Sequence, residues 1–347
     1  MSMLPGAPWL LAHSSMLSVN KPLRVSLCGQ DYVMWKDERG HIQALPNSCP
    51  HMGAMLSEGW CEAKSDGTSS VVCPFHALAF DPEGCTVLPG SQKKTRSLLQ
   101  PLELIIQGDF IWSYGGAEPV MAIPNILNNI AADYEFVGVA GDTSVETPLL
   151  PMLLNMHDYN HQNGTHREMF RIESVQIDHF EDKGHYSEAA MRMPKAKPTR
   201  REIMQNPAVL MIPDVIEAHF DNHFPSLVVL KGSSAAGPIA QCHLFIPESA
   251  ERTRTYVLVF AQLKSPIFRL MKSSVLKLVS TVIEQDANIL TKLYADQPQT
   301  IKLNNEVGMD WVKRNYENWP NICEPTASRI FSANIDRTAE ENDDAND

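Results

Sequence analysis

Cys49-Pro50-His51 and Cys73-Pro74-Phe75-His76 are two short tracts that each contain one cysteine, a proline directly after it, and one histidine. Two thiolates and two imidazoles from separate loops can hold a [2Fe–2S] cluster, with the cysteines on one iron and the histidines on the other. A structural zinc site is the alternative, but zinc sites of this composition usually combine a Cys-x-x-Cys knuckle with a separate pair of histidines. The mixed halves favour the cluster, so we expect the chain to transfer electrons one at a time.

The segments around these tracts have the pattern of short strands and turns. Residues 23–27 and 32–35 are apolar runs of strand length. Residues 62–70, which separate the two tracts, read as an inserted loop, and the glycines and proline of residues 115–119 read as a linker. The pattern predicts a small antiparallel β domain over residues 1–118 that holds the cluster.

A second group of metal-ligating residue types lies downstream. Residues 149–161 are predicted to be helical, and Asn155, Asp158 and His161 recur at every third position, so they can share one face. After a turn, the chain can bring His166 back toward His161. Two such histidines and one carboxylate form the facial triad that binds non-heme Fe(II) and leaves positions open for O₂.

The carboxylate of this triad is expected on a distant helix, predicted over residues 265–294. Asp286 is the candidate ligand and Glu284 is its competitor. The alternative is that both acids only face solvent on the helix surface. The presence of the histidine pair favours Asp286 as the third ligand.

The order and spacing of these motifs resemble the terminal oxygenase component of Rieske non-heme iron oxygenases. The resemblance extends over about residues 8–320, and it is closer to the homotrimeric vanillate O-demethylase and dicamba monooxygenase type than to longer catalytic subunits. It depends on five features together: Cys49-x-His51, Cys73-x-x-His76, Asn155-x-x-Asp158, His161-x₄-His166 and Asp286.

The resemblance implies a role for each matching residue. The cluster irons would be held by Cys49 and Cys73 on one side and by His51 and His76 on the other. The mononuclear iron would be held by His161, His166 and Asp286. Asp158 would connect a Rieske histidine of a neighbouring subunit to a histidine of the catalytic site, because a carboxylate can accept N–H groups from two imidazoles. Asn155 is expected beside the iron ligands, and His157 has no assigned role.

The resemblance also implies an α+β fold. Residues 1–118 would form the antiparallel β Rieske domain, and residues 119–330 the catalytic domain with an antiparallel sheet packed by helices. Residues 240–246 and 255–262 are its expected neighbouring strands. Residues 331–347 are predicted to be an acidic disordered tail, since they contain few apolar residues.

The function implied by the resemblance is that of a Rieske-type monooxygenase or dioxygenase. Such an enzyme uses O₂ and externally supplied electrons to hydroxylate or oxidatively dealkylate a small organic substrate. A separate NAD(P)H-dependent reductase or ferredoxin is the expected electron donor, because the sequence lacks a G-x-G-x-x-G fingerprint. The alternatives are a Rieske electron-transfer protein without oxygenase turnover and a non-catalytic iron-binding or regulatory protein. Within the oxygenases, the alternative is oxidation of a pigment or alkaloid instead of demethylation of an aromatic acid. A homotrimer is expected.

The sequence also departs from the usual family pattern. Met52 stands where the first Rieske loop commonly has arginine, and Ala77-Leu78 stands where the second commonly has glycine and tryptophan. The other cysteines show no paired spacing, and a Cys61–Cys85 bridge is less favoured than reduced thiols. The basic residues 192–201 could be a lid, an anchor for an anionic substrate or, as favoured here, a solvated loop.

Composition limits the remaining functional classes. The chain has 29 basic and 41 acidic residues, a net charge of −12, which disfavours nucleic-acid binding. No run of about twenty apolar residues occurs, so no membrane span is expected. The N-terminal segment lacks the basic residues of a signal peptide, and we expect a cytoplasmic protein.

Overall fold

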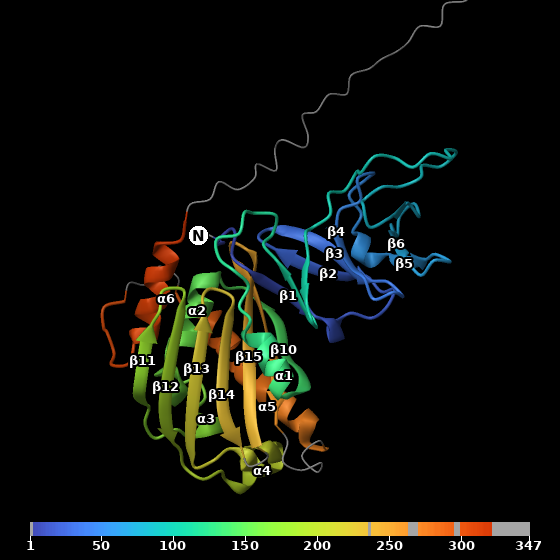
Figure 1. The fold of residues 1–347 in the computed structure, drawn as a ribbon. Helices are drawn as coiled ribbons and strands as arrows, with labels where there is room; N and C mark the ends of the chain where they lie inside the picture. Colours follow the sequence, from blue (N-terminus) through green and yellow to red (C-terminus); the bar gives the residue numbers. More distant parts are fainter. Residues whose placement is uncertain (1–2, 235–236, 263–269, 295–298, 321–347) are drawn as a thin grey trace, which may run out of the picture.

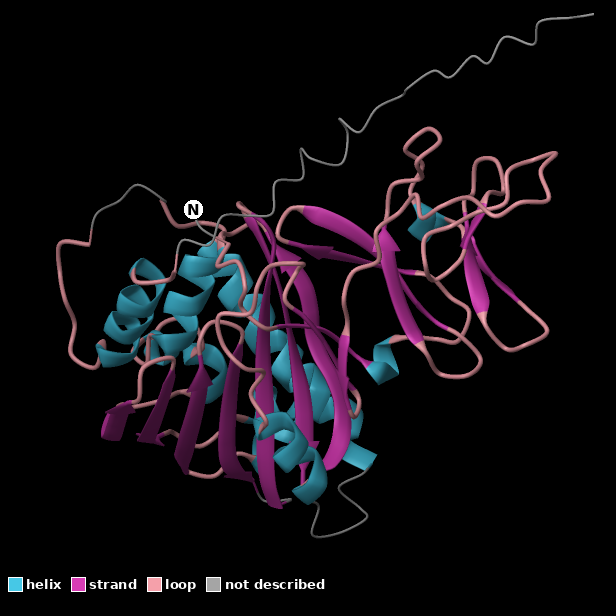
Figure 2. Ribbon diagram, turned by 45° about the horizontal axis from the view of Figure 1, so that its top comes forward, coloured by secondary structure: helices cyan, strands magenta, loops and turns pink. Residues whose placement is uncertain are grey.

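The computed structural model describes residues 3–234, 237–262, 270–294 and 299–320. Within them the chain has the α+β fold that the sequence predicts. Small antiparallel sheets form the N-terminal part, and a larger antiparallel sheet covered by helices forms the rest (Figure 1, Figure 2). The predicted tail, residues 331–347, lies outside the described residues.

The N-terminal part contains three three-stranded sheets. Their orders are β1-β9-β8, β2-β3-β4 and β5-β6-β7. The prediction that residues 62–70 are a loop is wrong at both ends, because these ends belong to the paired strands of a hairpin. The turn between the strands is closed by Asp66, whose carboxylate accepts the amide N–H of Thr68 at 2.9 Å. The strands are β1 Trp9–His13, β2 Leu23–Leu27, β3 Gln30–Lys36, β4 Ile42–Pro46, β5 Trp60–Ala63, β6 Ser69–Val72, β7 Ala79–Phe80, β8 Ile105–Gln107 and β9 Phe110–Ser113.

Seven strands form the larger sheet, in the order β10-β16-β15-β14-β13-β12-β11, with every neighbouring pair antiparallel. The two strands expected at residues 240–246 and 255–262 are confirmed as neighbours in β15 and β16. The strands are β10 Glu135–Val145, β11 Gln176–Asp182, β12 Tyr186–Pro194, β13 Val215–His223, β14 Leu227–Ser234, β15 Gly237–Ser249 and β16 Arg252–Ala261.

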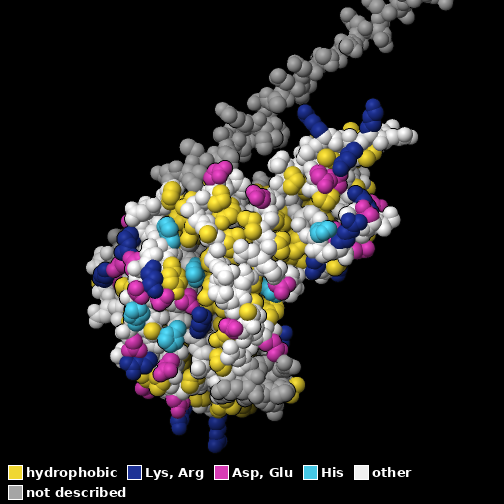
Figure 3. All heavy atoms as spheres, viewed as in Figure 1, with side chains coloured by type: hydrophobic (Ala, Val, Ile, Leu, Met, Phe, Trp, Pro, Cys, Tyr) yellow, Lys and Arg dark blue, Asp and Glu magenta, His cyan; other side chains and the backbone are white. Residues whose placement is uncertain are grey.

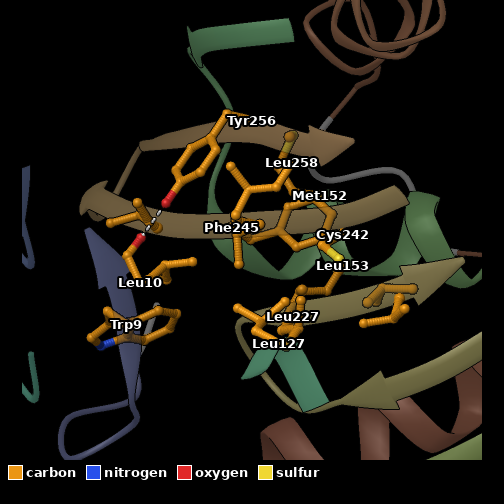
Figure 4. Close-up of a cluster of buried hydrophobic side chains, with 14 of the residues drawn as sticks. Trp9, Leu10, Leu127, Met152, Leu153, Leu227, Cys242, Phe245, Tyr256 and Leu258 are labelled. Atoms are coloured by element: carbon orange, nitrogen blue, oxygen red, sulfur yellow. Dashed lines mark hydrogen bonds between the residues drawn. The ribbon is translucent and has the colours of Figure 1, made fainter. Parts of the chain in front are cut away.

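The two parts of the chain share one hydrophobic core. Strand β1 is fully buried, and its Trp9 and Leu10 belong to the same cluster as Cys242 and Leu258 of the larger sheet (Figure 4). The hydroxyl of Tyr256 donates to the carbonyl of Leu10 at 2.8 Å, which joins the first strand to the last. The N-terminal part is therefore attached to the sheet by buried apolar area as well as by hydrogen bonds.

The helices are α1 Ile126–Asp133, α2 Leu149–His157, α3 Arg167–Phe170, α4 Arg200–Gln205, α5 Lys272–Leu290 and α6 Val307–Glu317. Helix α5 is part of the helix predicted over residues 265–294; residues 263–269 lie outside the described residues. It packs closely on β10 because β10 has glycines at the contact. A Cβ at Gly138 would lie 2.8 Å from Leu276, and one at Gly141 would lie 2.8 Å from Ile283. Those glycines set the distance between α5 and the sheet.

Two candidate metal centres and the cavity beside one of them

The two cysteine–histidine tracts form loops with matching backbone hydrogen bonds. The Cys49 carbonyl accepts the amide of Gly53 at 2.8 Å, and the Cys49 amide donates to the Ala54 carbonyl at 2.9 Å. In the second loop the Cys73 carbonyl and amide make the corresponding bonds, at 3.1 and 2.9 Å, to the residues four and five positions later. The chain folds back at a left-handed residue in each loop, Gly53 with φ +75° and Ala77 with φ +54°.

Four ligand side chains converge between these loops. Cys49 and Cys73 are 3% and 1% exposed, and their thiols lie within hydrogen-bond reach of each other. His51 and His76 are exposed, and their Nδ1 atoms face each other at 3.2 Å. Burial, and secondarily the neighbouring Cys73, raises the pKa of Cys49. Two close thiols opposite two close imidazole nitrogens fit a cluster with cysteines on the inner iron and histidines on the outer one.

Each of the two exposed histidines has an exposed apolar residue next to it in the sequence. Met52, which replaces the usual arginine, is 65% exposed, and Phe75 is 59% exposed with its ring 3.9 Å from that of His76. An apolar side chain therefore directly adjoins each exposed cluster histidine along the chain.

The second ligand group begins where helix α2 ends. The sequence predicts helix over residues 149–161, but α2 ends at His157 and Asp158 has an extended backbone. The physical reason is local, because the Asp158 carboxylate accepts the amide N–H of Asn160 at 3.0 Å and so closes a turn that competes with the helix. Asp158 and His161 therefore do not share a helix face. His161 instead begins a short 3-10 helix, His161–Asn163.

His161, His166 and Asp286 nevertheless come together. One ligand atom from each lies within 4.8 Å of the others. The Oδ1 atom of Asp286 lies 3.6 Å from Nε2 of His161 and 3.2 Å from Nε2 of His166. Glu284 is exposed on the other side of α5 and is not part of this group.

The contacts around the three side chains orient them for metal binding. Nδ1 of His161 bonds to the carbonyl of Asp158, and Nδ1 of His166 bonds to Oε1 of Gln285 at 2.7 Å. Since a carbonyl oxygen only accepts, each Nδ1 carries the proton and each Nε2 keeps its lone pair as an acceptor. Nε2 of His161 accepts from the side-chain amide of Gln162 at 3.1 Å. Nε2 of His166 and Oδ1 of Asp286 are buried with no good hydrogen bond, as expected of atoms that hold a metal.

Electrostatics within the group keep Asp286 ionised. Burial raises the pKa of Asp286, but the neighbouring His166, His161 and Asn155 side chains outweigh it, and the net pKa lies below the usual value. Burial also lowers the pKa of His161, whereas contact with Asp286 and Gln285 outweighs burial at His166 and raises its pKa. An ionised carboxylate beside a neutral imidazole is the protonation state that a divalent metal requires. Asn155 therefore contacts the ligand group, as the sequence suggests.

A cavity of about 210 Å³ adjoins His161, His166 and Asp286. It lies between α5 and the face of the sheet formed by β12 to β15, and apolar side chains, methionine and isoleucine foremost, form most of its wall. His243 of β15 also lines it. Burial lowers the pKa of His243 to about 4. The sequence gives no motif around His243 or Gln285, and both were missed for that reason.

Two further expectations concern the surface and the thiols. Arg192 forms a two-pronged ion pair with Asp178, at 2.7 Å for both contacts. Of residues 192–201, only Met193 lines the cavity, so the basic side chains of this segment do not anchor a substrate there.

Cys61 and Cys85 are both free thiols. Among the described residues, no helix is both long and apolar enough to cross a membrane.

Comparison with known proteins confirms the family resemblance that the sequence predicts. The chain carries a Rieske domain and is related to the oxygenase components of Rieske non-heme iron oxygenases. Residues 8–100 match the Rieske [2Fe-2S] domain family. That match also agrees with the expected [2Fe–2S] cofactor.

Individual relatives agree with this class. The chain is 26% identical over 186 residues to aminopyrrolnitrin oxygenase PrnD of Pseudomonas fluorescens, covering 51% of this chain and 49% of that protein. It is 26% identical over 167 residues to the vanillate O-demethylase oxygenase subunit of a Pseudomonas species, covering 47% and 46%. The chain thus spans about half the length of the curated relatives it matches. Both relatives are named as oxygenases, which is consistent with an oxidoreductase.

Solved structures extend the likeness to the whole fold. Dicamba monooxygenase bound to dicamba superposes with a TM-score of 0.71 at 18% identity, covering 90% of this chain and 96% of that one. The superposition includes the larger sheet and its helices, which lie beyond the matched Rieske domain.

Proposed function

We propose that this chain is a Rieske-type oxygenase that uses O₂ and externally supplied electrons to hydroxylate or oxidatively dealkylate a small organic substrate. The observation that carries the proposal is the group formed by His161, His166 and Asp286 at the wall of an apolar cavity. A Rieske electron-transfer protein would need the first ligand set and would have no use for the second. When bound, the cluster supplies single electrons and a mononuclear Fe(II) supplies a binding position for O₂.

Each side chain of the two ligand groups would have a separate role. Cys49, Cys73, His51 and His76 would hold the cluster. Asp286 would give the mononuclear iron a negative ligand, while Asp158 and Gln285 keep the imidazoles of His161 and His166 aimed at it. The apolar wall would exclude water and hold the substrate beside the metal position.

Asp158 would also connect the two centres across a subunit boundary of a homotrimer. One of its carboxylate oxygens accepts the Asn160 amide, and its side chain is half-buried at the cavity. Figure 1 places β5 and β6, near the cluster loops, at the end of the molecule far from α3 and α5. Exposed His51 and His76 on one chain and Asp158 on another therefore suit contact between subunits better than contact within one.

The electron donor would be a separate NAD(P)H-dependent reductase or ferredoxin, and we place the protein in the cytoplasm. The donor proposal is supported by the relative that is named as an oxygenase subunit, and by the two exposed cluster histidines. Replacing the usual arginine with Met52 implies a donor surface that relies less on charge pairs at this point.

The experiment is to measure iron and acid-labile sulfide per chain on anaerobically purified protein, followed by O₂ uptake with a donor and candidate substrates. About three irons to two sulfides, with substrate-dependent O₂ uptake, is the expected result. About two irons to two sulfides after Fe(II) is added would leave the electron carrier as the better reading. Zinc without sulfide would refute the Rieske assignment itself.

A matched pair of variants tests the bridge. Asp158→Asn keeps an acceptor for the Asn160 amide, so it is expected to retain both metals and the fold. It should lose most substrate oxidation in a single turnover with a pre-reduced cluster, because an amide cannot accept from two imidazoles as a carboxylate does. Asp182→Asn, a surface change on β11, is the control. Unchanged oxidation in Asp158→Asn would exclude the bridging role.

A further inference from the structure

The two residues that flank Asp158 are deeply buried, although Asp158 itself is only half-buried. His157 and Tyr159 are each 2% exposed. Nδ1 of His157 donates to the carbonyl of Leu153 at 2.7 Å, which leaves Nε2 as an acceptor inside the protein. Buried polar groups are nearly always paired, so Nε2 of His157 and the hydroxyl of Tyr159 each need a partner from another segment.

That partner is Asn222 of strand β13. Its side chain is fully buried and lies within hydrogen-bond reach of both His157 and Tyr159. Its Nδ2 also donates to Oγ of Ser187 at 3.1 Å. Nε2 of His157, the hydroxyl of Tyr159 and Oδ1 of Asn222 have no other partner in the part of the chain that the structure describes. An amide has two N–H donors and one carbonyl acceptor, which is enough to serve all three neighbours.

Helix α6 packs tightly against the same segment. The ring of Trp311 lies 5.4 Å from that of His157. A Cβ at Gly308 would lie 2.8 Å from the carbonyl oxygen of His157 and 3.0 Å from the hydroxyl of Tyr159. Helix α6 thus leaves the two buried side chains no room to move toward it, and their remaining polar contact is the one with Asn222.

The position of this segment matters to the metal site in two ways. The carboxylate of Asp158 lines the cavity and accepts the amide N–H of Asn160 at 3.0 Å. The backbone carbonyl of Asp158 accepts from Nδ1 of His161 and so orients that imidazole. A shift of the residues on either side of Asp158 would therefore move the carboxylate and turn the iron ligand together.

We propose that Asn222 is a positioning residue that fixes the Asp158 carboxylate and the His161 imidazole by holding the two residues that flank Asp158. The inference rests on the proposed oxygenase function and adds to it a residue that is not among those lining the cavity. The expected effect of Asn222 is therefore on the geometry of the mononuclear site and on the oxidation rate, while the affinity for substrate stays unchanged.

The first test needs no turnover. Hydrogen–deuterium exchange, read by mass spectrometry on the full chain as purified, would follow the peptide that covers residues 157–161. Asn222→Leu, which keeps a similar volume and loses the amide, should speed exchange there about tenfold, because a net hydrogen bond is worth about one factor of ten. The control is Tyr256→Phe, which removes the buried hydrogen bond from Tyr256 to Leu10 in another part of the core. Equal exchange at residues 157–161 in Asn222→Leu and the parent would overturn the proposal.

The second test reads the mononuclear site itself. Nitric oxide added to the Fe(II) protein with an oxidised, EPR-silent cluster gives a signal whose shape depends on the arrangement of the iron ligands. Asn222→Leu should change that shape and slow substrate oxidation in a single turnover about tenfold, the lower end of the range for residues that support a metal ligand. Tyr256→Phe should match the parent in both. An unchanged signal in Asn222→Leu, or the same change in both variants, would show a merely structural role and refute the inference.

The inference and the proposed function fail in different ways. A parent protein without a nitric oxide signal or substrate-dependent O₂ uptake would refute the proposed function, while the exchange experiment would still decide whether Asn222 holds residues 157–161. If Asn222→Leu does not fold, Tyr159→Phe takes its place, because it keeps the ring and loses only the hydroxyl within reach of Asn222. It should speed exchange at residues 157–161 by a smaller factor, and no change there would overturn the proposal.

Discussion

Replacing Gln285 should weaken the mononuclear metal site without touching a ligand. Oε1 of Gln285 accepts from Nδ1 of His166 at 2.7 Å, and His166 is fully buried. In Gln285→Leu this N–H keeps its burial and loses its acceptor. The ring is then free to rotate or to exchange its proton between nitrogens, and either change removes the lone pair of Nε2 from the metal position.

The magnitude follows from the lost bond. Leaving a buried donor unpaired costs about 1–3 kcal/mol, which corresponds to about 5- to 150-fold in a binding constant. Loss of a hydrogen bond that supports a metal-ligating histidine typically costs about 10- to 100-fold in metal affinity, within the same range. We therefore expect the Fe(II) affinity of this site to fall by about one to two factors of ten.

The assay exploits the presence of two kinds of iron in one chain. Protein is equilibrated anaerobically against a graded series of chelators, and iron and sulfide are then counted. Gln285→Leu should fall from about three to about two irons per two sulfides at a weaker chelator than the parent does, with an unchanged cluster spectrum. Glu284→Gln is the matched control, because Glu284 precedes Gln285 on α5 but is exposed. Identical iron retention in Gln285→Leu and the parent would refute the reasoning.

Three further outcomes are expected. Gly141→Ala should lower the free energy of unfolding by about 2–4 kcal/mol in denaturant, since its Cβ would lie 2.8 Å from a side chain of α5 and its φ is +61°. The control Gly184→Ala has the same kind of backbone, φ +81°, but open space around the new Cβ, so it should cost no more than about 2 kcal/mol. Equal costs for the two variants would contradict the packing argument. Gly53→Ala should lower the temperature at which cluster absorbance is lost, whereas Ala77→Gly should raise it slightly; the opposite signs would exclude backbone strain as the cause. The free energy of unfolding should fall by up to about 3 kcal/mol as the pH is lowered from 6.5 to 4, because the pKa of His157 is near 6.5 in the unfolded chain and about 4 in the folded one. An equal fall in His157→Leu would show that other groups cause it.

The sequence predicts the cluster loops well because their chemistry and their geometry are both local. Each tract carries its ligands and its turn within six residues, from Cys49 to Ala54 and from Cys73 to Leu78. The strand pair β15 and β16 was also predictable, since two long apolar runs are joined by a short polar turn. The left-handed backbone at Ala77 could not be predicted, because an alanine in the sequence does not indicate a conformation that glycine normally adopts.

Prediction was poorer where side chains compete with the helix or where partners come from distant segments. The α2 helix ends at His157 because Asp158 bonds to the backbone of Asn160, a local competition that apolar periodicity does not report. His243 and Gln285 were missed for a different reason. Each gains its meaning only from the residues that the sheet and α5 place opposite it, and a single buried histidine or a helix glutamine is not distinctive by itself.

The difference between local and long-range contacts also explains why the position of the third metal ligand depends on packing. His161 and His166 lie five residues apart and are fixed by one turn, but Asp286 arrives on α5, more than a hundred residues later. The position of α5 is set by its contact with β10, where Gly138 and Gly141 lie at register shifts in the pairing of β10 with β16. The amide of Gly141 donates to Ser280 Oγ at 3.0 Å, which also ties the helix to the strand along its axis. A small displacement at these glycines would move Asp286 and Gln285 together, so the glycines of β10 should matter to metal binding as much as residues much nearer the iron position.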